Sequence, residues 1–263
     1  MSEIWEWLVN NFVAFLMVTA RISGIFTFNP IFSRQNVPMR VKIGMTIVLS
    51  VVTMSYMGNS LVYTAEGIPS FVLNLGKELI VGLALGFFVN LIITVIIYAG
   101  EVMDTQIGFG MAKAMDPMTG VQMPLFANLF YYIFILYFFI VGGHLKYIQL
   151  FVTSYEILPL GYGFTADSIN LAYFIVNYLG VVLTLAVKFA APILAAELIT
   201  EFIIGVMMKA VPTIQIFVIN IQLKIVVGIL VLLAVAKPMS DFLEYLMGLL
   251  FQNLDNIIKL IGT

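Results

Sequence analysis

Two glutamates set four residues apart are the side chains of this sequence best placed for ion chemistry. Glu197 and Glu201 lie within a long apolar run and would share one face of a helix. Like charges at that spacing repel each other unless water or a cation lies nearby. One interpretation is a proton or cation relay in a transporter. The other is a solvated face or a salt bridge between subunits, and the sequence leaves both open.

Five further charged residues lie inside or beside apolar runs. They are Arg21, Lys77, Glu78, Lys188 and Lys224. Each would cost roughly 2.5–3.5 kcal/mol at a lipid-facing helix centre on insertion scales. Their number predicts that many helix faces contact protein or water in place of lipid. Lys77 and Glu78 are adjacent and cannot pair within one helix, so we expect neighbouring chains to satisfy them.

The remaining motifs argue against an enzyme. The single histidine, His144, has no carboxylate four residues away with which to form a metal site, and cysteine is absent. Gly108-Phe-Gly110 is not a dinucleotide motif, because Lys113 stands where the third glycine should be. No set of a nucleophile and a base is visible. We therefore expect no catalytic site, no metal and no cofactor.

A polar, Gly- and Met-rich insert runs from Glu101 to Pro124, and we predict that it forms a shaped loop. Irregular backbone beside membrane helices survives only where protein or water satisfies its amides, so such a loop lines a cavity or a path. Residues 103–123 hold five of the 15 methionines of the chain. Met111, Met115 and Met118 would align along a short helical turn. Their thioethers suit a flexible seal across a pore, and they equally suit an ordinary irregular packing contact.

The composition predicts a membrane-associated protein. Hydrophobic residues make up 62% of the 263 residues and charged residues only 10%, whereas soluble domains are near a quarter charged. The net charge of −2 gives no support to nucleic-acid binding. Glu3 and Glu6 precede any basic residue, which argues against a cleavable signal peptide.

Apolar runs predict about six long helical units, since a helix needs about 20 apolar residues to cross the hydrocarbon core. The runs are Trp7–Phe28, Val41–Met57, Phe71–Ala99, Leu125–Val141 with a continuation through Leu158, Leu171–Met208 and Ile214–Ala236. Val41–Met57 is marginal in length. Leu171–Met208 is too long for a simple crossing and should bend or project beyond the membrane. Gly82 and Gly86 have the spacing at which helix backbones approach closely.

The segment from Ser240 to Ile261 predicts an amphipathic helix. Leucines and isoleucines recur on one side at helical spacing, opposite acidic and amide side chains. Two interpretations stay open: the helix lies on the bilayer surface, or it packs on a partner subunit.

Several short motifs follow one another along nearly the whole chain. They are Arg21-Ile-Ser-Gly24, Val37-Pro38-Met-Arg40-Val-Lys-Ile-Gly44, Gln106-Ile-Gly-Phe109 with Asp116-Pro117, Gly143-His144, Leu158-Pro-Leu-Gly161, Ala191-Pro192-Ile-Leu-Ala195 and Lys209-Ala-Val-Pro212. No single motif is specific, but their order and spacing together resemble the FliR family. That family belongs to the bacterial flagellar type III export gate and has SctT and SpaR relatives in injectisomes. Gly142 departs from the Asp that family members often carry before Gly-His.

The resemblance implies an all-α protein of bent helical hairpins that assembles in a heteromeric export-gate complex. Residues 1–165 would form a FliP-like half, and residues 166–263 a FliQ-like half that ends in the amphipathic helix 240–261. The implied partners are FliP-like and FliQ-like subunits, FlhB-like and FlhA-like export proteins, unfolded flagellar proteins in transit and membrane lipid. The implied location is the bacterial inner membrane at the flagellar basal body.

The resemblance also implies that the loop from about Gln106 to Met123 plugs the export channel. The expected plug or gate residues are Phe109, Met111, Met115, Asp116, Pro117 and Met118. The buried charges would then face sister subunits or an aqueous lumen. On this hypothesis the chain is a structural and gating subunit without enzymatic activity. The alternative is a proton- or cation-coupled transporter of small solutes.

Overall fold

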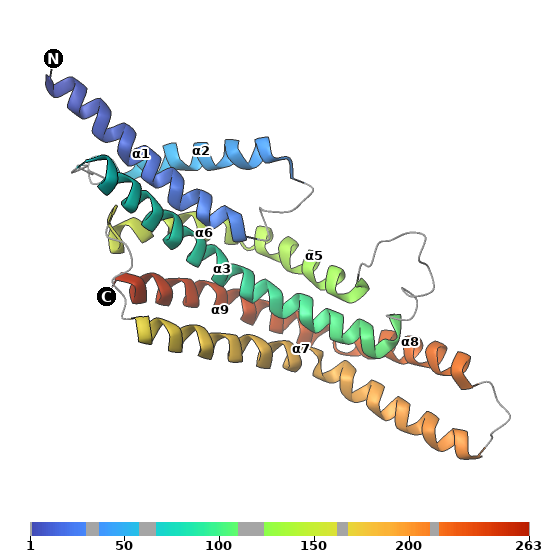
Figure 1. The fold of residues 1–263 in the computed structure, drawn as a ribbon. Helices are drawn as coiled ribbons and strands as arrows, with labels where there is room; N and C mark the ends of the chain where they lie inside the picture. The colour runs from blue at the N-terminus through green and yellow to red at the C-terminus, as the bar shows by residue number, and fades with distance from the viewer. Residues whose placement is uncertain are drawn as a thin grey trace. The chain divides into compact units, whose positions relative to one another are not determined.

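The chain is all-α: eight helices and no strand lie within the residues that the structure describes. A computed structural model describes residues 2–29, 37–57, 67–109, 124–161, 168–210 and 216–262. The helices are α1 (Ser2–Phe28), α2 (Met39–Met57), α3 (Ile68–Ile107), α5 (Leu125–Ile140), α6 (Gly143–Ile157), α7 (Ser168–Ala210), α8 (Ile216–Ala234) and α9 (Ala236–Gly262), shown in Figure 1. The predicted fold class is confirmed.

Within the described ranges, four helices are long and apolar enough to cross a membrane, and the number rises to six if each of two bent pairs counts as one span. The single helices are α1, α2, α3 and α7, and the bent pairs are α5 with α6 and α8 with α9. This range includes the predicted six long units. The 43 residues of α7 extend about 65 Å at 1.5 Å per residue, and Pro192 lies inside the helix.

The turn between α5 and α6 depends on Gly142. Its backbone has φ 71° and ψ 23°, in the left-handed region, which costs a residue with a Cβ atom roughly 1–2 kcal/mol. Its amide donates a hydrogen bond to the Phe139 carbonyl at 3.2 Å, and its own carbonyl accepts one from the Leu145 amide at 3.0 Å. The apolar run predicted from Leu125 through Leu158 therefore forms two helices, α5 and α6.

The helices pack as two compact units, each built from separate stretches of the chain. The first comprises Met1–Leu91, Phe138–Asn177 and Leu249–Thr263, and the second comprises Ile92–Tyr137 and Tyr178–Gly248. The predicted halves, 1–165 and 166–263, concern a likeness to other export proteins and stay a prediction.

The core of the first unit forms where α1, α2 and α6 meet. Val18, Ile22 and Phe26 of α1 lie buried with Tyr155 of α6. Partly buried side chains pack against this cluster, namely Met45, Leu49, Met54, Met57 and Leu160. α1 also crosses α3 at very short range. A Cβ atom at Gly24 would lie 2.6 Å from the Leu79 carbonyl oxygen, and one at Gly86 would lie 2.5 Å from the Ile25 carbonyl oxygen.

Gly82 lies at the centre of this crossing, where an added Cβ atom would overlap the backbone carbonyl of Arg21. Gly82→Ala should therefore destabilise the protein by about 1–3 kcal/mol, as overpacking does in a well-packed core. Gly76→Ala on the same helix is the matched control, because nothing lies within 4 Å of a Cβ atom there. It should be neutral or stabilising. Thermal unfolding in detergent measures both, and equal losses would contradict the close crossing.

The apolar face of α9 is buried within the chain itself. Leu246 and Ile257 are 0% exposed, and Phe242 stacks on Phe189 of α7 with ring centroids 5.0 Å apart. The Lys146 ammonium of α6 lies 5.8 Å from the centre of the Phe251 ring. The two predicted locations of the helix, on the bilayer surface or against a partner subunit, stay predictions. The helix is amphipathic as predicted, but its apolar stripe packs on its own fold.

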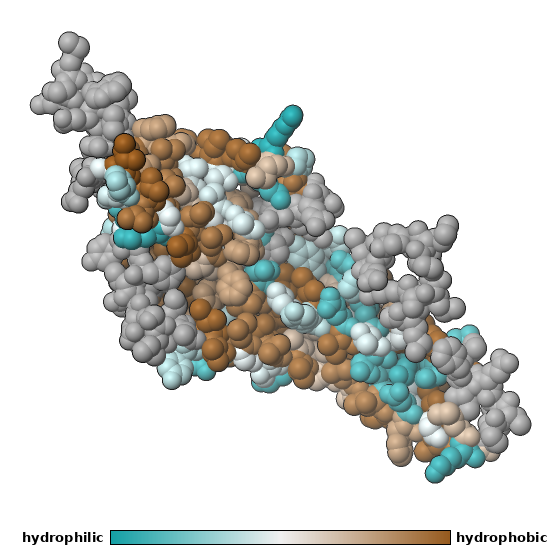
Figure 2. Space-filling view, viewed as in Figure 1, coloured by the Kyte–Doolittle hydropathy of each residue, from teal (hydrophilic) through white to brown (hydrophobic). Residues whose placement is uncertain are grey.

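Large apolar side chains also cover much of the described surface (Figure 2). On α7, Leu198, Ile199 and Phe202 are each at least 59% exposed. Contiguous apolar surface of this kind faces lipid or protein in place of water.

Candidate functional site

The central segment, defined here as residues 110–123, connects the end of α3 to the start of α5 and lies outside the described residues. Met111, Met115, Asp116, Pro117 and Met118 belong to it. The predicted loop began too early, because α3 continues through Gln106 to Ile107. Met103 and Ile107 are 0% exposed, and their spacing of four residues places both on one buried helix face. The helix ends at Gly108, whose φ is 96°.

Asp104 ties the two ends of the central segment together. Its carboxylate oxygens Oδ1 and Oδ2 each accept a hydrogen bond from the Phe126 amide at 3.1 Å, although Asp104 lies on α3 and Phe126 on α5. Asp104 is 1% exposed. A carboxylate at this place accepts a hydrogen bond from a free amide of the first helical turn and is stabilised by the positive end of the helix dipole. We call the end of α3 and the start of α5 the root of the central segment. The root thus includes a capped helix start.

The backbones of α3 and α5 also approach closely beside this cap. A Cβ atom at Gly100 would overlap the backbone of Ala127. Sequence reasoning named neither Asp104 nor Gly100 as a site residue. One signal was present: α5 begins after Gln122-Met123-Pro124 with no Ser, Thr, Asn or Asp in the capping position. A helix start without its own capping residue predicts a capping group from elsewhere in the chain.

Phe109, the one predicted plug residue within the described part, begins a row of aromatic rings. Its ring lies 5.9 Å from that of Phe126, which lies 6.4 Å from Phe130. Phe130 contacts Phe189 of α7 at 5.0 Å, and Phe189 stacks on Phe242 of α9 at 5.0 Å. Phe109 is half-buried. Phe109 therefore packs on the aromatic row at the start of the central segment, and its predicted role in the plug stays a prediction.

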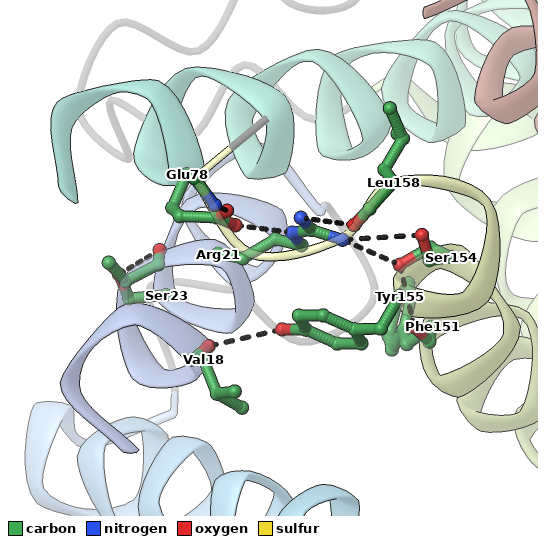
Figure 3. A network of polar contacts seen from close by, with 10 residues as sticks. Val18, Arg21, Ser23, Glu78, Phe151, Ser154, Tyr155 and Leu158 are labelled. Carbon is green, nitrogen blue, oxygen red and sulfur yellow. Dashed lines mark hydrogen bonds and ion pairs between the residues drawn. The ribbon is translucent and has the colours of Figure 1, made fainter. Parts of the chain in front are cut away.

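Arg21 and Glu78 form a buried ion pair in the first unit (Figure 3). Arg21 Nε donates to Glu78 Oε2 at 2.6 Å, and both side chains are 1% exposed. The expectation that a neighbouring chain satisfies Glu78 is therefore wrong. The two residues are 57 positions apart in sequence, and the crossing of α1 over α3 brings them together. The sequence around Lys77 and Glu78 does not show that Arg21 is the partner of Glu78.

Every remaining face of the ion pair is occupied by α6 and the turn after it. Arg21 Nη2 donates to the Leu158 carbonyl at 2.9 Å, and Nη1 donates to Ser154 Oγ at 3.3 Å. The guanidinium carbon lies 4.1 Å from the centre of the Tyr155 ring. Glu78 Oε1 accepts a hydrogen bond from the Gly161 amide at 2.9 Å. Because so many donors and acceptors are matched, the network fixes α6 against α1 and α3.

The other predicted charges lie in different environments. Lys77 and Lys188 are exposed on the isolated chain. Lys224 is 12% exposed, and its Nζ lies 3.6 Å from Oε2 of Glu201, which is 58% exposed. Glu197 is 0% exposed. The two glutamates that share a helix face thus differ: Glu201 has a cation beside it, while Glu197 is enclosed.

His144 lies half-buried at the start of α6, with its ring 5.3 Å from that of Phe139. No group of three or more His, Asp or Glu side chains that could hold a metal ion lies within the part of the chain that the structure describes.

Comparison with known proteins matches this chain nearly end to end. Residues 12–250 match the family model of bacterial export proteins, family 1. The chain is 28% identical to the flagellar biosynthetic protein FliR of Bacillus subtilis (strain 168) over 97% of its own length and 98% of that protein. It is 29% identical to FliR of Escherichia coli (strain K12), covering 98% and 96%. It is also 29% identical to the surface presentation of antigens protein SpaR of Shigella flexneri, over 59% of each chain. The resemblance drawn from the motifs is confirmed, and the chain belongs to the bacterial export proteins, family 1.

Proposed function

We propose that this protein is a structural subunit of a flagellar-type protein-export gate in the bacterial cytoplasmic membrane. The observation that carries the proposal is the end-to-end similarity to proteins named flagellar biosynthetic protein FliR. The helices that are long and apolar enough to span a membrane support the location. The proposed partners are FliP-like, FliQ-like, FlhB-like and FlhA-like chains, and the proposed cargo is unfolded flagellar protein. The gate subunit itself carries no enzymatic activity.

The exposed charges support assembly with other chains. Lys188 is exposed on α7, where the nearby apolar side chains Val187 and Leu183 are also exposed, at 61% and 59%. A lysine on a lipid-facing stripe is costly, whereas a lysine against a partner's acidic or polar group is not. We infer that this face of α7 contacts protein in the native complex.

Co-purification tests the proposed assembly directly. The tagged chain, expressed in its own bacterium, should be recovered in a complex with FliP-like and FliQ-like chains, and the mass of the native particle should exceed that of one chain several-fold. Lys188→Glu should reduce recovery of that complex. Lys259→Glu is the control, because Lys259 lies on the exposed polar side of α9 and contacts Asp255 of its own helix at 2.6 Å.

The transporter alternative predicts a different result. A solitary chain that moves a small solute across vesicle membranes in response to an ion gradient would support it. Recovery of the chain alone, without any partner, would contradict the export-gate assignment. An inert reconstituted chain that is recovered with partners would support the assignment.

We also propose that the central segment closes the export channel. The two ends of the segment are joined by the Asp104–Phe126 hydrogen bonds and the Phe109–Phe126 ring contact. The methionines of the segment, Met111, Met115 and Met118, would give the plug an apolar, deformable surface. Such a surface can seal a channel and yield when a polypeptide enters.

A further inference from the structure

Glu197 is a buried acid without a hydrogen-bond partner among the described residues. It is 0% exposed, and both of its carboxyl oxygens are enclosed and without a partner there. An ionised carboxylate in such a place loses its hydration without compensation, and the free-energy cost is high enough that the group neutralises instead. The other buried acids of the described part differ, because Glu78 pairs with Arg21 and Asp104 caps α5.

The carboxyl group of Glu197 lies where α7, α8 and the end of α3 meet. Gly228 of α8 leaves the space that it occupies: a Cβ atom there would lie 3.2 Å from Glu197 Oε1 and 2.8 Å from Ile107 Cδ1. Ile107 is the last residue of α3. Glu197 therefore packs beside the root of the central segment.

The charges around Glu197 do not balance. Lys224 of α8 and Glu201 of α7 are the charged groups that act on it electrostatically. On α3, Asp104 lies one turn before Ile107, and its carboxylate is occupied by the Phe126 amide. Lys224 lies within 3.6 Å of Glu201, so this one ammonium group faces two carboxyl groups. One further positive charge is needed to neutralise the cluster.

We propose that Glu197 is a proton-binding site: in the resting protein its carboxyl group is held as the neutral acid against Gly228. A proton fits the enclosure, whereas a hydrated metal ion does not, since both oxygens are shielded and the cluster offers no third ligand.

Infrared difference spectroscopy of the full chain in its native complex tests the proton site. At neutral pH, the spectrum of the wild-type complex minus that of Glu197→Gln should show one C=O stretch of a protonated carboxyl group, and exchange into deuterated water should shift it. Glu156→Gln is the control, because that acid is exposed on α6 and lies outside the charge cluster of Glu197. The difference between the wild type and this control should lack the band. Alkaline titration of the wild type should abolish it.

Two results would overturn the proposal: no protonated-carboxyl band in the wild type at neutral pH, or the same band in Glu197→Gln. Should Glu197→Gln fail to accumulate, wild-type protein made with isotope-labelled glutamate gives the same answer by NMR. The carboxyl carbon of a neutral glutamic acid is resolved from that of a carboxylate, and an absent neutral resonance at neutral pH would exclude the site.

Discussion

Glu78→Gln should destabilise the protein by about 3–5 kcal/mol, because it leaves the Arg21 guanidinium buried without its counter-charge. Arg21 is 1% exposed, and its remaining acceptors, the Leu158 carbonyl and the Ser154 oxygens, are neutral. Arg21→Met should cost a similar amount, since the Glu78 carboxylate would keep only the Gly161 amide as a donor. Both variants should accumulate poorly in membranes and unfold at lower temperature in detergent.

A double variant separates the ion pair from its surroundings. Arg21→Met combined with Glu78→Gln removes both charges, so its loss of stability should be smaller than the sum of the two single losses. Lys77→Met is the matched control, because this neighbour of Glu78 is exposed and its removal should change stability by no more than about 0.5 kcal/mol. Single losses as small as that of the control would contradict a buried, coupled pair.

Periodicity and hydropathy predicted the helices of this chain well. The apolar runs Trp7–Phe28 and Val41–Met57 correspond closely to α1 and α2, because Pro30 follows the first run and Pro38 precedes the second. The error at Glu101–Ile107 has a physical reason. Glu101 and Thr105 occupy the exposed side of the helix there, while Met103, Asp104 and Ile107 are buried. A polar stretch is therefore not a loop when its apolar residues keep helical spacing.

Partners of charged residues could not be predicted in the same way. Arg21 lies 57 residues from Glu78 and 133 from Ser154, so only the tertiary packing brings them together. The Gly82–Gly86 spacing predicted a close helix approach, but it did not say which helix would approach. In the same way, the sequence did not show that Asp104 would meet Phe126 or that Glu197 would pack against Gly228. The sequence identified the charged groups that are costly to bury, but only the structure shows which of them are paired.

Deletion of residues 110–119 should open an ion leak and leave the fold intact. Five residues, Gly120 to Pro124, would remain between Phe109 and Leu125, and six peptide links reach about 20 Å when extended. The rings of Phe109 and Phe126 are only 5.9 Å apart, so the shortened chain can close without strain. The Asp104–Phe126 cap and the aromatic row stay in place, because none of their residues is removed.

The measurement is the membrane conductance of cells that express the complex with the deleted chain. Wild-type complex should leave the conductance at the level of cells without it, whereas the deletion should raise it clearly, since ten residues of the proposed seal are missing. Met111→Ser, Met115→Ser and Met118→Ser combined keep the length of the segment and remove its apolar surface, so this variant should leak to a smaller degree. Unchanged conductance in a deletion variant that still co-purifies with its partners would contradict the plug. Loss of co-purification would instead place the central segment at a subunit contact, because the root contacts that hold the fold together survive the deletion.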